Sequence, residues 1–207
     1  MFHMVIRRLL AAVGLAAIFA APLAWSQDAP PVRVRGTIER VENPVFVVKS
    51  RDGAELKIVL AENAVAVGVV KATLADIKPG LFVGIGAMPQ ADGTQRALEV
   101  LIFPEAMRGL GEGHYPWDLQ PNSTMTNGNV EQVVTGVDGN TLTVKYKDGE
   151  KKIIVPSGAP IVTFVPGDKA DLKAGVKIFI GAAKKLPDGA LQAARVNYGK
   201  DGLTPPM

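Results

Sequence analysis

The sequence predicts an all-β protein of two tandem, small antiparallel β-barrels of the OB-like kind, related by internal duplication. Two observations carry this prediction. Segments of residues 32–103 recur in the same order in residues 128–198, and such a repeat indicates two copies of one structural unit. Segments in both copies also alternate apolar and polar side chains with a period of two, which is typical of half-buried strands.

The duplication rests on matched segments that keep their order, with a first hairpin that is four residues longer in the second copy. Gly36-Thr-Ile-Glu-Arg-Val41 matches Gly128-Asn-Val-Glu-Gln-Val133, and Ala75-Asp-Ile-Lys-Pro-Gly80 matches Ala170-Asp-Leu-Lys-Ala-Gly175. The remaining matches pair 46–49 with 142–145 and 82–87 with 177–182. We therefore expect a first barrel repeat at 27–103, a linker at 104–127 and a second barrel repeat at 128–198.

Turn signals separate the expected strands in both copies. Asp-Gly pairs occur at 52–53, 92–93, 148–149 and 188–189, and they suit tight hairpins because glycine accepts a positive φ. The Asp-Leu-Lys-x-Gly stretch reads as one helical turn that ends at its glycine. A closed barrel is favoured over an open sandwich shared by the copies, because closure removes exposed strand edges.

The two ends of the chain read as segments outside the barrels. Residues 1–26 have a basic head, an apolar run and small residues before Gln27, which is typical of a cleaved secretory signal. The alternative is a retained membrane anchor, although the apolar run is shorter than a spanning helix requires. We expect a protein exported to the periplasm, with a frayed C-terminal tail at 199–207.

Composition limits the function further. The chain has no cysteine, which excludes thiol chemistry and thiolate metal sites. Without Arg7 and Arg8 the 23 basic residues become 21, against 20 acidic residues. Such a neutral surface favours neither nucleic acid nor anionic lipid. No other apolar run is long enough to span a bilayer, so we expect no integral membrane protein after cleavage.

The linker at 104–127 is the one stretch without a counterpart in the other copy, and it holds the candidate site. An aromatic pair and several polar groups gather there, and they could form the walls and anchors of a surface for a ligand or a protein partner. Packing of Tyr115 and Trp117 as plugs between the barrels is the competing interpretation. The candidate binding residues are Arg108, Glu112, His114, Tyr115, Trp117 and Asp118.

Two chemical alternatives remain open in the same stretch. His114 could serve a metal-handling accessory protein, although one histidine without cysteine does not make a usual zinc site. Glu112 and Asp118 could serve an enzyme of the cell envelope as paired carboxylates. Ser123 lacks the surroundings of a nucleophilic serine. We therefore assign no catalytic residue, metal ligand or cofactor.

The repeated Gly-x-[Ile/Val]-Glu-x-Val strand, the Asp-[Ile/Leu]-Lys-x-Gly turn and the stretch from Pro104 to Gly128 carry a resemblance. The chain resembles a bacterial family of exported tandem small-barrel proteins of unknown function, whose members are sometimes labelled metal transporter permeases. The resemblance implies the fold and the compartment. The permease label does not suit a chain without spanning segments. The leading hypothesis is a non-catalytic periplasmic binding or adaptor protein, with its ligand or partner surface at the junction of the barrels.

Overall fold

The computed structural model describes residues 30–137 and 139–206, and the expected signal at 1–26 lies outside them. The all-β class is confirmed, because in the described part of the chain the helical elements are 3-10 turns of three residues. These turns are η1 (Leu74–Asp76), η2 (Glu105–Met107), η3 (Lys169–Asp171) and η4 (Lys200–Gly202). The strands are β1 (Val32–Glu42), β2 (Val45–Ser50), β3 (Glu55–Ala72), β4 (Phe82–Pro89), β5 (Gln95–Ile102), β6 (Gly113–Pro116), β7 (Thr124–Gly136), β8 (Gly139–Tyr146), β9 (Gly149–Pro156), β10 (Ile161–Pro166), β11 (Lys177–Lys185) and β12 (Leu191–Gly199).

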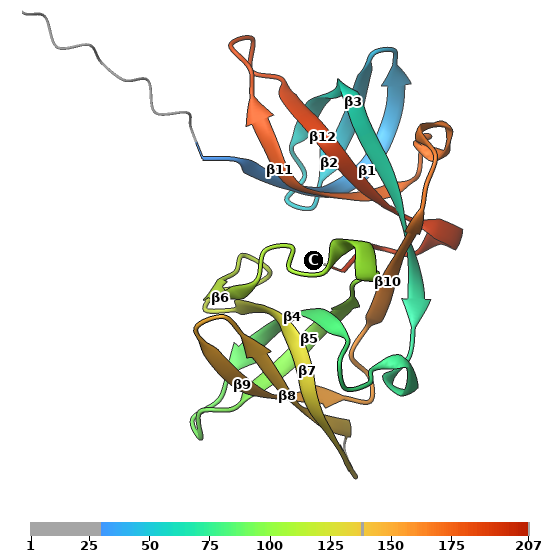
Figure 1. Ribbon diagram of the computed structural model, residues 1–207. Coiled ribbons are helices and arrows are strands. Elements are labelled where there is room, and N and C mark those ends of the chain that lie inside the picture. The colour runs from blue at the N-terminus through green and yellow to red at the C-terminus, as the bar shows by residue number, and fades with distance from the viewer. Residues whose placement is uncertain (1–29, 138, 207) are drawn as a thin grey trace, which may run out of the picture.

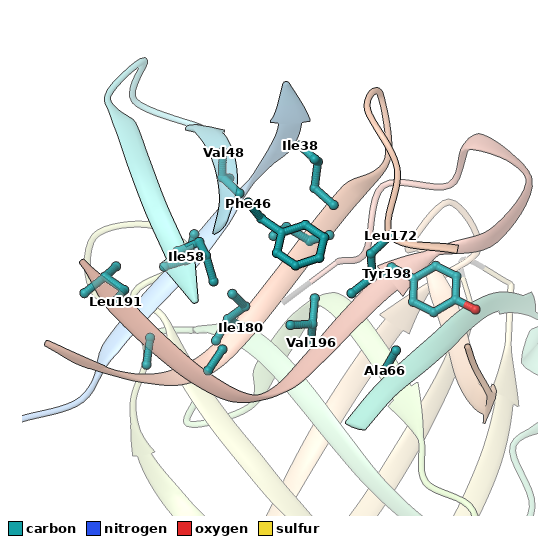
Figure 2. Packing of buried hydrophobic residues seen from close by; sticks show 14 residues of the cluster. Ile38, Phe46, Val48, Ile58, Ala66, Leu172, Ile180, Leu191, Val196 and Tyr198 are labelled. Carbon is teal, nitrogen blue, oxygen red and sulfur yellow. The ribbon is translucent and has the colours of Figure 1, made fainter. Parts of the chain in front are cut away.

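A closed five-stranded barrel forms one lobe of the molecule (Figure 1). Its strands follow the order β12, β11, β1, β2 and β3, and β12 closes the ring by pairing in parallel with β3. Alternate apolar residues of these strands point inward and fill the interior, as Figure 2 shows for Ile38, Phe46 and Ile180. This arrangement follows from the period of two, which gives each strand one apolar face.

The other lobe contains a second ring of strand pairs. Strand β4 pairs with β5 and β7, and the order continues through β8 to β9. A short parallel contact of β5 with β9, at Gln95↔Ile153 and Arg96↔Ile154, completes the ring. A second cluster of apolar side chains fills this ring, with Val83, Ile85, Leu142 and Ile153 fully buried.

The strand pairs do not follow the expected division into two self-contained copies. The first barrel combines β1, β2 and β3 of the first copy with β11 and β12 of the second. The second ring combines β4 and β5 with β7, β8 and β9. Through β10, all twelve strands belong to one hydrogen-bonded sheet. The two segments expected to be copies therefore exchange their C-terminal halves in the strand pairing.

The exchange has a physical cause in β3. This strand runs for 18 residues, and its stretch 59–67 contains no proline or glycine that would let the chain turn back. The first half of β3 pairs with β2, while its end, 67–72, pairs antiparallel with β10 (Figure 1). The chain is thereby carried across to the other lobe. In the second copy Pro156 and Pro160 divide the corresponding stretch into β9 and β10, because proline interrupts a strand.

A third apolar cluster lies between the two rings. It contains residues from strands of both lobes and from β10. Met107, Trp117 and Leu203 pack against it. Its buried members are Val67, Val69, Phe82, Leu101, Phe103, Val162, Phe164 and Phe179. The rings are therefore joined by an apolar layer as well as by hydrogen bonds.

Two predicted segment boundaries need correction. The linker expected at 104–127 ends earlier, because Thr124 to Asn127 already belong to β7 and pair with β4. The tail expected to fray from residue 199 is packed: Pro205 is buried, and Lys177 Nζ donates to Thr204 Oγ1 at 3.0 Å. Contact with the apolar layer through Leu203 explains why this stretch is held.

Candidate ligand-binding site

The central segment, residues 104–123 between β5 and β7, is fastened to the second ring at its start by Arg108. The guanidinium of Arg108 donates to both carboxylate oxygens of Glu105 at 2.6 Å, to the carbonyl of Gly80 at 2.9 Å and to Asn129 Oδ1. The hydrogen bond from Arg108 holds the pKa of Glu105 below its ordinary value. All four hydrogen bonds thus go to the protein itself, and Arg108 serves as a clamp.

The segment continues as β6, which pairs with the start of β7 and places Tyr115 beside Asn127. Asn127 Nδ2 donates to the Tyr115 hydroxyl at 3.3 Å and to the carbonyl of Leu110 at 3.1 Å. Burial raises the pKa of the Tyr115 phenol, and the charge of Arg33 opposes this rise. Gly111 has φ +62°, and a Cβ there would lie 3.0 Å from Asn127 Nδ2. Glycine is needed at this close approach.

Trp117 follows β6 and meets the first barrel. The guanidinium carbon of Arg33, on β1, lies 4.1 Å from the centroid of the Trp117 ring, which is a cation–π geometry. The Tyr115 ring meets the indole edge-on, with centroids 6.2 Å apart. Ser123 Oγ donates to the carbonyls of Trp117 and Gln120 at 3.0 and 2.7 Å, and this serine holds the turn after the tryptophan.

Asp118 locks the segment onto the first barrel. Its carboxylate accepts a hydrogen bond from Arg35 at 2.9 Å and lies 3.7 Å from Arg33. Burial favours the neutral acid, but the hydrogen bond from Arg35 and the charges of Arg35 and Arg33 keep the pKa of Asp118 below its ordinary value. Asp118 is therefore an ionised anchor between the segment and β1.

These contacts border a half-open cavity of about 600 Å³ at the junction of the two lobes, a volume within the range of small-molecule sites. The central segment forms one wall, and the other walls come from both rings and from β10. The lining residues are Arg33, Gly84, Leu101, Phe103, Leu110, Gly111, Tyr115, Trp117, Met125, Asn127, Phe164, Phe179, Gly181, Ala182, Ala194, Arg195 and Asn197. The lining is predominantly aromatic and aliphatic and contains no carboxylate.

Three buried polar atoms of this lining have no hydrogen-bond partner among the described residues. They are Trp117 Nε1, Asn127 Oδ1 and Asn197 Oδ1. Asn127 and Asn197 are only 7% and 4% exposed. Buried polar groups without partners destabilise a fold by about 1–3 kcal/mol each, so three around one cavity require an explanation. One donor and two acceptors without partners therefore lie in the walls of this cavity, beneath its surface.

Of the six predicted site residues, the structure brings Tyr115 and Trp117 into this cavity. Asp118 does not line the cavity, but its carboxylate lies 3.7 Å from Arg33, whose guanidinium lies over the Trp117 ring. Arg108, Glu112 and His114 do not line the cavity. Within the described part of the chain, no hydrogen bond or ion pair joins Glu112 to His114 or Asp118.

His114 faces the second ring instead. Its Nδ1 lies 2.9 Å from Thr126 Oγ1, and its ring stacks on Tyr146 with centroids 6.1 Å apart. Burial, followed by the charge of Lys151, lowers the pKa of His114 below its ordinary value. Among residues 30–137 and 139–206 no three histidine or carboxylate side chains gather as a metal site would require.

A larger cleft of about 870 Å³ opens elsewhere between the lobes and includes Arg35, Arg51 and Lys177 in its lining. These cations are already bonded within the protein. Arg35 binds Asp118, Arg51 donates to the carbonyl of Leu119 at 3.4 Å, and Lys177 donates to Thr204. The smaller cavity is therefore the better candidate site.

Most of the cavity lining escaped the sequence analysis. The aromatic residues Phe103, Phe164 and Phe179 read as ordinary core positions of strands, and nothing local distinguishes Asn127, Asn197 or Arg195. A signal does exist at Gly84, where a Cβ would lie 2.7 Å from Asn127 Oδ1. A glycine inside a strand indicates close approach of another group.

Comparisons of the chain with family models, with curated proteins and with solved structures found no match. No helix in the described ranges is long and apolar enough to cross a membrane. The geometry of the cavity is therefore the guide to function.

Proposed function

We propose that this chain is a non-catalytic binding protein that takes one small, mainly apolar molecule into the junction cavity. The observation that carries the proposal is the set of three buried, unpartnered polar atoms around an aromatic-walled space. An apolar body would pack against the phenylalanine walls, and its polar atoms would satisfy Trp117 Nε1 and the two asparagine oxygens.

The place and origin of the protein are part of this proposal. A cleaved signal at 1–26 would deliver the protein to the periplasm, where a chain without cysteine needs no disulfide. The two lobes would be tandem OB-like barrels from one duplicated module, as the matched segments indicate. The swapped halves would then form the cavity at the contact of the two lobes.

The experiment uses N-phenyl-1-naphthylamine, an uncharged dye that fluoresces in apolar surroundings, excited directly in a titration of the protein. Ala194 is exposed and lines the cavity, so Ala194→Trp fills the space with little strain on the core. Ala91→Trp, at the exposed turn between β4 and β5, is the matched control. We expect saturable binding of one dye per chain, weakened about tenfold or more by Ala194→Trp and unchanged by Ala91→Trp.

The proposal is wrong if the unmodified chain shows no saturable dye binding. It is equally wrong if Ala194→Trp retains the circular dichroism of the native protein and binds the dye as well as the control. Either result would leave the cavity as a packing defect between the lobes.

A further inference from the structure

We infer that the molecule bound in the junction cavity is an amphipathic anion whose charged group is held by Arg195. This inference rests on the proposed function and assigns the chemical class of its ligand. Arg195 and Asn197 lie two residues apart on β12, so their side chains leave the same face of the strand. Both line the cavity.

Arg195 differs from the other arginines around the junction in what it binds. Arg33 and Arg35 contact the carboxylate of Asp118, and Arg108 binds Glu105. In the described part of the chain, no carboxylate lies within ion-pair distance of Arg195. Its two terminal nitrogens reach only the sulfur of Met107, at 3.8 and 3.9 Å.

A thioether sulfur is a weak acceptor, so no strong acceptor among the described residues holds the half-buried guanidinium. The neighbouring Phe164 ring centroid, 6.0 Å from the guanidinium carbon, adds only a long cation–π contact. A planar guanidinium is well suited to bind a carboxylate, sulfonate or phosphate through two parallel hydrogen bonds. Arg195 is thus an anion-binding group without an anion from the protein.

The other lining residues indicate the charge, the hydrogen-bonding groups and the apolar body of the ligand. Arg33 adds positive charge and no lining residue is acidic, so a cationic ligand is disfavoured. Asn197 Oδ1, buried and unpartnered next to Arg195 along β12, accepts a hydrogen bond from an N–H or O–H group near the charged end. The phenylalanine walls take the apolar body. The ligand class is therefore an apolar organic acid that also carries a donor.

Two dyes with the same body test this inference. N-phenyl-1-naphthylamine is uncharged, and 8-anilinonaphthalene-1-sulfonate adds one sulfonate to the same aromatic amine. Dissociation constants for both are measured with the unmodified chain, with Arg195→Gln and with Arg96→Gln. Arg96 is exposed on β5 and does not line the cavity, so its variant controls for the change in net charge.

We expect the unmodified chain and Arg96→Gln to bind the sulfonate dye more tightly than the neutral dye. Arg195→Gln should reduce this preference about tenfold or more, which is the effect of losing a hydrogen-bonded charge pair. Equal affinity for the two dyes, or a preference that survives Arg195→Gln, overturns the anionic assignment while the proposed binding function stands. Binding of neither dye at the cavity overturns both.

Discussion

At the scale of single residues, the cavity is defined by polar groups that the fold leaves unsatisfied. Asn197 is 4% exposed, and its Oδ1 has no hydrogen-bond partner in the described part of the chain. Asn127 differs, because its Nδ2 binds Tyr115 and Leu110 while its oxygen has no partner. A residue kept for folding alone would be apolar at such a position.

Asn197→Leu is the substitution that separates folding from binding. Leucine has a similar volume and removes a buried amide oxygen without a partner, so the free energy of unfolding should rise by about 1 kcal/mol or more. Dye affinity should fall in the same variant. Urea unfolding followed by circular dichroism measures the first effect. A variant less stable than the unmodified chain would show that the asparagine is bonded in the folded state.

The sequence could identify Tyr115 and Trp117 because they stand in the only stretch without a counterpart in the repeat. It could not identify Asn197 or Arg195. Their roles depend on β12 closing a barrel with β3 of the other copy, and that pairing joins residues more than one hundred positions apart. Arg108 misled the sequence analysis, because its partners Gly80 and Asn129 become neighbours only through the β4–β7 pair.

At the scale of elements, the exchange of C-terminal halves decides where every site residue lies. Most strands and turns could be predicted, since alternation and Asp-Gly pairs are local signals, but β6 lies in the stretch expected to be a linker. The partners of the strands could not be predicted in the same way. Equivalent strands pair in a self-closed and in an exchanged arrangement, so the alternation pattern does not distinguish the two. The continuous β3 is the feature that favours the exchanged form.

A cysteine pair tests the exchange, because the chain has no cysteine of its own. Thr37 of β1 and Lys177 of β11 are directly paired, and paired residues of antiparallel strands lie about 4.5–5.5 Å apart, within disulfide range. Thr37→Cys with Lys177→Cys should form an intramolecular disulfide under oxidation. Non-reducing electrophoresis of the monomer and mass spectrometry of its peptides detect it.

The control is Asn129→Cys with Lys177→Cys, the pair that a self-closed second copy would bring together. In the structure Asn129 pairs with Phe82 and Lys145 instead. A disulfide in this control and none in the first pair would contradict the exchanged topology.

At the scale of the whole molecule, two rings of strands meet across an apolar layer, and Met107 and Trp117 of the central segment pack against that layer. Arg108 fastens the segment to the second ring, and Asp118 fastens it to the first barrel. Trp117 therefore has both roles considered from the sequence, as a packing residue and as a wall of the candidate site. It packs against the junction core and also forms a wall of the cavity.

The central claim is that a ligand enters this cavity and satisfies its polar atoms, and the indole N–H of Trp117 reports on that most directly. The measurement is the indole cross-peak in a ¹⁵N–¹H correlation spectrum, assigned by its loss in Trp117→Phe, during titration with 8-anilinonaphthalene-1-sulfonate. If the ligand binds beside the indole, this peak shifts saturably, with the dissociation constant found by fluorescence. An indole peak that stays in place while the dye binds would contradict the claim.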